Sequence, residues 1–454
     1  MMKRVVFAFL VALIAGGVLR GQQPPASQPP AAQQPTDITT VIAGEGGQAP
    51  RLAIPDFIPL TNDAETVAIA RTISQVLWDD LNYEHEFTFV PRDVYKTIPP
   101  AVSFETVAFD RWRELNPDGL IVGTVEKNAS GIKVEMRLYK VSTRAVAYGR
   151  VYSGSGANPR AYAHLIADEI HKTQRALNGV AQSKLTFSSD RDGLKITGTV
   201  QDRNVKEIYI SDYDGERQTR VTVGRTLNAF PRWSPDRRSI VYTSWRHGPP
   251  NLFVSNLTEA TLDELTKGPT ENMLGVWSPD GTKICFESNR DGNMELYVVN
   301  RDGTNLRRLT NNRAIDSSPT WAPSGNQIAF VSDRSGTPQI YLVSADGVGN
   351  VDRLTSEAYA DKPTWSPAPY NEIAFAARTG PGFDIKVIDV VSRKVTQLTF
   401  GEGTNESPAY SPNGRHIAFS STRSGKTQVF TMTRDGRDLR QITKVGNNQQ
   451  PDWR

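Results

Sequence analysis

The sequence has 454 residues, 22% of them charged, and a formal net charge of +3. This length exceeds one ordinary domain, and a charge so near zero gives no case for nucleic-acid binding. The single cysteine, Cys285, excludes an intramolecular disulfide, and its place in an apolar run predicts a buried structural thiol.

The chain begins with a targeting pattern. Two basic residues precede an uncharged, mostly apolar run from Val5 to Leu19. As a helix this run would span about 22 Å, short of the roughly 30 Å hydrocarbon core. We therefore predict a signal peptide over residues 1–21, with an uncleaved anchor as the alternative, and a destination outside the cytoplasm without membrane insertion after cleavage. Residues 22–36 are rich in Gln and Pro and predict a flexible linker.

Residues 37–180 predict a small α/β domain. Asn62 and Glu65 form a capping-box pattern, and the apolar periodicity that follows, as far as Leu81, is typical of a helix. Further helices are predicted over 104–115 and from Asn158 to a C-cap at Gly179, and strands over 51–57, 87–90, 119–125, 132–141 and 145–152.

From residue 181 onward one motif recurs, written Trp277-Ser-Pro-Asp-Gly in one copy. Pro, Asp and Gly supply tight-turn chemistry, and each repeat contains four strand-like runs, of which the aromatic is expected to open the innermost. A period of this length predicts a propeller with one four-stranded sheet per repeat. The aromatics lie 44, 44, 44 and 45 residues apart, at Trp233, Trp277, Trp321, Trp365 and Tyr410.

Six outer-strand ends predict six blades. The first repeat, from Lys184, lacks an anchoring aromatic, and the missing piece lies at the other end of the chain as Pro451-Asp452-Trp453. We therefore predict that residues 181–454 form an all-β six-bladed propeller closed by the C-terminal strand, with each aromatic packed between neighbouring blades. The six ends are Val221-Thr222, Leu265-Thr266, Leu309-Thr310, Leu354-Thr355, Leu398-Thr399 and Ile442-Thr443.

Catalytic motifs are missing from the sequence. It contains no G-x-S-x-G elbow, no H-E-x-x-H, no phosphate-binding glycine loop in a strand–helix context and no Cys/His metal spacing. We therefore expect a protein that is not an enzyme and has no catalytic residue, bound cofactor or Cys/His-type metal site.

Two positional series predict a functional mouth of the propeller channel. Both are expected on the same face, the first around the channel and the second further out. Asn and Asp can instead bond the loop backbone, and Arg can brace a loop, so a purely structural role is the alternative. As a binding surface, the mouth would accept a partner's segment or a hard cation such as Ca²⁺. The first series is Asn228, Asn272, Asp316, Ala360, Asn405 and Asn448, and the second is Arg191, Arg246, Arg290, Arg334, Arg378 and Arg423.

The order of signal peptide, α/β domain and six blades resembles the TolB family, periplasmic components of the Tol–Pal system. Two further stretches support the resemblance: residues 116–125, which look like that family's central strand, and residues 208–215, which look like its first-blade turn. The resemblance implies a monomeric periplasmic adaptor that supports outer-membrane integrity and constriction at division. It also raises Ca²⁺ in the channel as a possibility.

The resemblance further implies two protein partners. A Pal-like lipoprotein would bind at the channel mouth, and a TolA-like inner-membrane protein would bind a short N-terminal segment. Here that segment stands behind the Gln/Pro-rich linker, which departs from the family pattern. Its residues are Asp37, Ile38, Thr39, Thr40, Val41 and Ile42.

Two alternatives of other classes stay open at this point. A secreted propeller hydrolase or lyase would need clustered acids or a nucleophile–base pair at one mouth. A generic propeller scaffold would bind an unrelated partner.

Overall fold

The structure is a computed structural model that describes residues 40–44, 48–128, 131–196 and 204–454. The predicted signal peptide and linker lie outside the described residues, as do residues 37–39 of the predicted N-terminal segment. Within the described ranges, no helix has the length and apolar character needed to cross a membrane.

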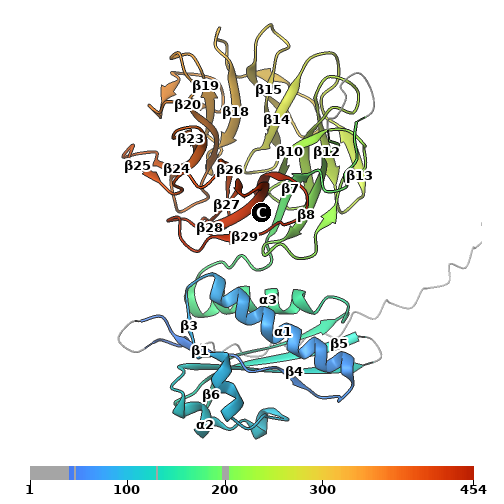
Figure 1. Cartoon of the computed structure of the whole chain (residues 1–454), viewed down its shortest axis with the longest axis vertical. Coiled ribbons are helices and arrows are strands. Elements are labelled where there is room, and N and C mark those ends of the chain that lie inside the picture. Colours follow the sequence, from blue (N-terminus) through green and yellow to red (C-terminus); the bar gives the residue numbers. More distant parts are fainter. Residues whose placement is uncertain (1–39, 45–47, 129–130, 197–203) are drawn as a thin grey trace, which may run out of the picture. The chain divides into compact units, whose positions relative to one another are not determined.

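The N-terminal α/β domain is a mixed sheet with helices on both faces. The strand order is β3-β1-β4-β5-β6, and β2 pairs with β4 (Figure 1). The parallel pairs are β1–β3, β1–β4 and β2–β4, whereas β4, β5 and β6 form an antiparallel meander. The strands are β1 Arg51–Ala53, β2 Ile58–Pro59, β3 Thr88–Phe89, β4 Gly119–Asn128, β5 Gly131–Lys140 and β6 Ala145–Gly154.

Helices α1 and α3 cover one face of this sheet, and the shorter helices cover the other (Figure 1). Ile73 and Leu77 of α1 and Ile166 of α3 are fully buried in the core on the first face, as their helical spacing requires. Trp112 lies in the core on the second face. The helices are α1 Ala64–Tyr83, η2 Arg92–Thr97, η3 Phe104–Thr106, α2 Phe109–Glu114 and α3 Pro159–Arg175.

Three local predictions in this domain were wrong. The cap of α1 is Asp63, whose carboxylate accepts from the Thr66 amide at 2.9 Å, so the Asn62 capping box does not form. The helix predicted over 104–115 is split, because Val107 and Ala108 leave the helical conformation between η3 and α2. The last helix ends earlier than predicted, at Ala176 in the left-handed conformation.

The propeller has six four-stranded antiparallel sheets, as predicted. Blade 1 is β30-β7-β8-β9, and blades 2 to 6 follow as β10–β13, β14–β17, β18–β21, β22–β25 and β26–β29. In blade 1 the C-terminal strand β30 pairs with β7, which confirms closure of the ring by the end of the chain. Trp453 is 2% exposed, and its indole N–H donates to Ser183 Oγ at 2.7 Å.

Each blade runs from the channel outward. The inner strands are β30 Asn448–Trp453, β10 Asn228–Trp233, β14 Asn272–Trp277, β18 Asp316–Trp321, β22 Ala360–Trp365 and β26 Asn405–Tyr410. The second strands are β7 Lys184–Ser189, β11 Ser239–Ser244, β15 Lys283–Ser288, β19 Gln327–Ser332, β23 Glu372–Arg378 and β27 His416–Ser424. The third strands are β8 Glu207–Asp212, β12 Asn251–Asn256, β16 Glu295–Asn300, β20 Gln339–Ser344, β24 Phe383–Asp389 and β28 Lys426–Thr433. The outer strands are β9 Thr219–Arg220, β13 Thr261–Glu264, β17 Arg307–Arg308, β21 Asp352–Arg353, β25 Val395–Gln397 and β29 Arg440–Gln441.

The aromatic of each repeat is the last residue of its inner strand. The sequence-based prediction that the aromatic opens this strand was therefore wrong. Trp277 is the last residue of β14, and the Ser-Pro-Asp-Gly turn follows at once. The Trp277 side chain packs with Val241 and Leu252 of the preceding blade and with Phe286 of its own blade. This confirms the predicted place of the aromatic between blades. Cys285 is fully buried in β15, as predicted, and burial raises the pKa of its thiol.

Candidate functional site

Every inner strand is interrupted by a bulge that turns one side chain toward the channel. The pairing register shifts between the second and fifth residues of each strand. The third residue has a positive φ, between 50° and 56°, a conformation that side-chain-bearing residues seldom adopt outside functional or over-determined sites. These six bulge residues are Phe230, Leu274, Ser318, Lys362, Ser407 and Gln450.

All six bulge residues line one cavity of about 340 Å³ at the end of the channel where the inner strands begin. We call this cavity the channel mouth. Its wall also includes the apolar side chains of Val276 and Ile315. Gln450 fixes part of the ring, since its side-chain oxygen accepts from the Phe230 amide at 3.0 Å. The sequence did not single out these residues.

Charged groups of both signs surround the apolar part of the channel mouth. Lys362 Nζ pairs with Glu406 at 3.0 Å, and the Ser318 hydroxyl donates to Asp361 at 3.2 Å. Arg232 adds a second cation to the lining. The mouth therefore offers an apolar surface with charged neighbours, the composition typical of a protein-binding site.

Glu287 is a buried acid in the wall of the channel mouth. Its side chain accepts from the Ser318 amide at 3.3 Å, and only 4% of the residue is exposed. Burial, reinforced by the charge of Asp361, raises the pKa of Glu287 to about 7. The carboxyl group is therefore uncharged when the pH is below about 7 and becomes a buried charge when the pH is higher.

The Asn/Asp series occupies the first position of each inner strand, and its side chains lie inside the wall. Each of these residues is fully buried, and none lines the cavity of the channel mouth. Four Arg side chains of the second series reach these residues, with distances of 2.7 to 2.9 Å between Arg Nη2 and the side-chain oxygen. The pairs are Arg191–Asn448, Arg290–Asn272, Arg334–Asp316 and Arg423–Asn405. The structure thus brings the two series together as bonded pairs behind the mouth.

A polar network joins three of these pairs, those of Asn272, Asn405 and Asn448, to the preceding blade. In blade 2, Asn251 begins the third strand and accepts from Thr266 at 3.0 Å and from Asn272 of blade 3 at 2.9 Å. The Thr266 hydroxyl also accepts from the Leu252 amide, so every member is satisfied. The third-strand acceptors of the Thr hydroxyls in the six blades are Glu207, Asn251, Glu295, Gln339, Asp384 and Gln428.

Two members of the Arg series lack this partner. Ala360 stands in the Asn position of blade 5, and Arg378 instead lies over the rings of Tyr359 and Phe383, 5.3 and 5.4 Å from their centroids. In blade 2, no residue with a described position bonds the buried Oδ1 of Asn228, and Arg246 lies over the ring of Phe253.

The side-chain oxygens of the Asn/Asp series do not fit a calcium site. Four already accept from Arg, and the guanidinium of Arg334 lies 2.8 Å from Asp316, where it would repel a cation. Among the residues with a described position, no three His, Cys, Asp or Glu side chains form a group that could hold a metal ion.

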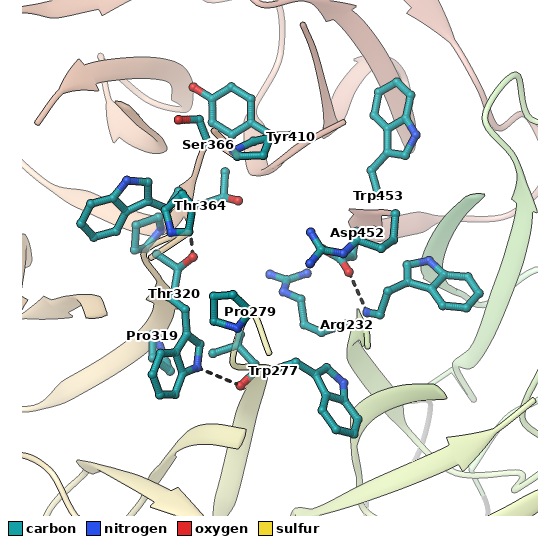
Figure 2. A pocket seen from close by; sticks show the side chains of 18 of the residues that line it. Arg232, Trp277, Pro279, Pro319, Thr320, Thr364, Ser366, Tyr410, Asp452 and Trp453 are labelled. Carbon is teal, nitrogen blue, oxygen red and sulfur yellow. Dashed lines mark hydrogen bonds between the residues drawn. The ribbon is translucent and has the colours of Figure 1, made fainter. Parts of the chain in front are cut away.

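The opposite end of the channel has a different lining. The cavity at this end has a volume of about 250 Å³ and is lined by the aromatics that close the inner strands and by prolines of the inner strands and of the turns after them. Figure 2 shows Trp277, Tyr410 and Trp453 around it. Bonds between neighbouring blades hold this ring, including Trp321 Nε1 to the Val276 carbonyl at 3.2 Å and the Trp233 amide to Asp452 at 2.7 Å. Part of this lining therefore holds neighbouring blades together.

The N-terminal segment predicted to bind a partner is described only from Thr40 onward. The Thr40 amide donates to the Ala147 carbonyl of β6 at 3.0 Å, and the Ile42 amide donates to Gln174 of α3 at 2.9 Å. Ile42 is 2% exposed in the core, whereas Val41 is 57% exposed. Asp37, Ile38 and Thr39 lie outside the described residues.

Comparison with known proteins finds matches to two family models. The model described as the TolB beta propeller domain matches residues 194–454, and the model described as the TolB amino-terminal domain matches residues 38–146. The first of these covers more than half of the chain.

Curated relatives and a solved structure agree with these family models. A Tol-Pal system protein TolB from Desulfosudis oleivorans is 33% identical over 210 residues, and one from Paramagnetospirillum magneticum is 32% identical over 208. The matched stretch spans 46% and 45% of this chain and 45% and 44% of those relatives, less than half of their length. The crystal structure of TolB from Acinetobacter baumannii superposes with a TM-score of 0.75 and 25% identity, over 89% of this chain and 96% of that one.

Proposed function

Because the chain belongs to the TolB beta-propeller family, we propose that it is a periplasmic adaptor of the Tol–Pal system. In this proposal, residues 1–21 direct export, and the mature chain supports outer-membrane integrity and constriction at division. Binding, without catalysis, is its activity.

The partner at the channel mouth is a Pal-like lipoprotein. The observation that carries this proposal is the inward turn of six bulge residues into one cavity, at positive φ in every blade. The bulge backbone repeats in every blade, but its side chains differ from blade to blade, so the six residues together give the cavity a surface of its own. Phe230 and Leu274 provide apolar contact, and Lys362 provides a charge.

The Asn/Asp and Arg series act behind the mouth in this proposal. In four blades their bonds fix where the inner strand begins, two residues before the bulge. A rigid ring of this kind binds with little rearrangement, so affinity depends on fit to a preformed surface. Changes at these residues therefore alter binding through the position of the strand.

The second partner is a TolA-like inner-membrane protein that binds residues 37–42. Because Ile42 is buried and its amide is bonded to Gln174, the partner must compete with the domain for that part of the segment. We expect Gln174→Ala to loosen the segment and strengthen binding of a TolA-like domain. Unchanged or weaker binding, measured by calorimetry, would count against this competition.

The direct test of the mouth is titration of the full mature chain with the soluble domain of the Pal-like lipoprotein from the same organism. We expect saturable one-to-one binding by isothermal titration calorimetry at micromolar concentrations or below. An absence of heat and of co-migration in gel filtration at those concentrations would reject the proposed partner.

A further inference from the structure

The α/β domain contains a second cavity, larger than either end of the propeller channel. Its volume is about 680 Å³, within the range of roughly 300 to 1,000 Å³ typical of small-molecule sites. It lies beside β2, between the first turns of α1, the short helix η2 and the segment that leads to α2. The proposed adaptor function does not use this cavity.

The deep wall of this cavity is hydrocarbon. Its buried lining side chains are those of Phe57, Ile58, Ile98, Val107, Trp112 and Val122. The hydroxyl of Tyr95 also lies in the lining but is already bonded, accepting from the Ile54 amide at 3.0 Å and donating to the Val90 carbonyl at 3.1 Å. The interior therefore suits an apolar chain that makes no hydrogen bonds.

The rim of the cavity carries an excess of positive charge. Arg71, Arg92 and Lys96 line it, against a single acid, Asp56. Arg92 is paired with Asp56 at 2.9 Å. Arg71 and Lys96 are exposed, and neither has an ion pair or hydrogen bond to any residue that the structure describes. Two cations at the entrance are thus left for an anion that none of the described residues supplies.

Four prolines at the rim disfavour an extended peptide as the occupant. A bound strand would need backbone N–H donors, and proline has none. Strand β2 itself ends on a proline. The rim prolines are Pro55, Pro59, Pro99 and Pro100.

We propose that this cavity binds the acyl chain of a fatty-acid carboxylate. The chain lies against the hydrocarbon wall, and the carboxylate is bound by Arg71 and Lys96 at the entrance. The planar fork of an Arg guanidinium matches a carboxylate in two parallel hydrogen bonds, and Lys adds a point charge. The domain would thereby bind a single-chain lipid anion independently of the propeller.

The test uses the full mature chain and dodecanoate carrying bromine on its alkyl chain, which quenches nearby indoles. We expect saturable one-to-one quenching at micromolar concentrations, lost in Trp112→Phe because Trp112 lines the cavity. Dodecanol should bind at least tenfold more weakly and dodecyltrimethylammonium not at all. Quenching that survives Trp112→Phe would place the ligand elsewhere and overturn the proposal.

Charge and shape are then changed separately. Arg71→Gln with Lys96→Gln should weaken dodecanoate binding at least tenfold, whereas the matched control Lys172→Gln with Arg237→Gln, at exposed sites outside the cavity, should leave it unchanged. Ala101→Phe should block the acyl chain without altering charge. Equal binding by both charge pairs, or tighter binding of an acidic amphipathic peptide or of a lysophospholipid than of dodecanoate, would contradict the proposal.

Discussion

The two ends of the propeller channel differ in how their residues vary from blade to blade. At the aromatic end, five blades carry Trp and one carries Tyr, each closing its inner strand. At the channel mouth the equivalent bulge positions hold Phe, Leu, Ser, Lys, Ser and Gln. A position that repeats does the same structural work in every blade, whereas a position that varies within a repeated backbone gives the mouth one particular surface.

The largest effect is expected where the ring closes at the aromatic end. Trp453→Ala removes a buried indole that packs in blade 1 and bonds Ser183. We expect a loss of about 3–5 kcal/mol in the free energy of unfolding, the usual range for such truncations. Urea denaturation followed by circular dichroism measures it. Trp453→Phe keeps most of the volume and should lose much less, and equal losses would contradict the role given to packing.

The next effect concerns Glu287 in the mouth and depends on pH. Its pKa is about 7 in the folded chain, against an ordinary value of 4.5. The group is neutral in both states below the lower value, so it costs nothing there. As pH rises toward 7 the unfolded state ionises first, and stability falls. We therefore expect Glu287→Gln to stabilise the chain at pH 8 by about 1–3 kcal/mol and to have little effect at pH 4.

Thermal unfolding of Glu287→Gln and the parent chain at both pH values gives this difference directly. A substitution effect that is the same at both pH values would show that the carboxyl does not ionise in this range. A loss of stability at pH 8 would show that its charge is satisfied in the wall.

The smallest expected stability effect is the difference in the free energy of unfolding between variants at two Arg residues behind the mouth. Arg423 bonds Asn405 at 2.9 Å, whereas Arg378 lies over the Tyr359 ring in the blade that has Ala360 in place of the Asn. We expect Arg423→Ala to cost about 1–2 kcal/mol, because a buried amide oxygen loses its donor, and Arg378→Ala to cost roughly half as much. Chemical denaturation of the two variants measures the difference. Equal costs would mean that stacking, which both residues share, accounts for the whole effect.

Much of the fold could be predicted from the sequence because the repeat is so regular. The turn residues and the aromatics mark each blade, and the unpaired Pro451-Asp452-Trp453 required closure. Helix ends were predicted less well. Asp63 caps α1 although Asn62 fits the pattern equally, since both side chains can accept from the helix amides and only the backbone path decides between them.

The bulge residues of the mouth could not be recognised by composition. A strand such as Asp316–Trp321, which reads Asp-Ser-Ser-Pro-Thr-Trp, resembles a loop, because polar residues and proline are rare in central strands. One signal was present. Five of the six inner strands carry Pro just after the bulge position, and within sheets proline is confined to edges and bulges. The burial of the Asn/Asp side chains depends on Arg residues 18 positions away in blades 3, 4 and 6, a pairing that spacing alone does not reveal.

The central claim is that the channel mouth is the surface that binds the Pal-like lipoprotein. The most direct test is the dissociation constant of that partner for Leu274→Asp, at a bulge position, and for Val391→Asp, at an equally apolar residue that is 79% exposed in a turn outside the mouth. We expect a loss of at least tenfold for Leu274→Asp, about 1.4 kcal/mol or more, and none for Val391→Asp. Unchanged binding by a folded Leu274→Asp protein would contradict the claim.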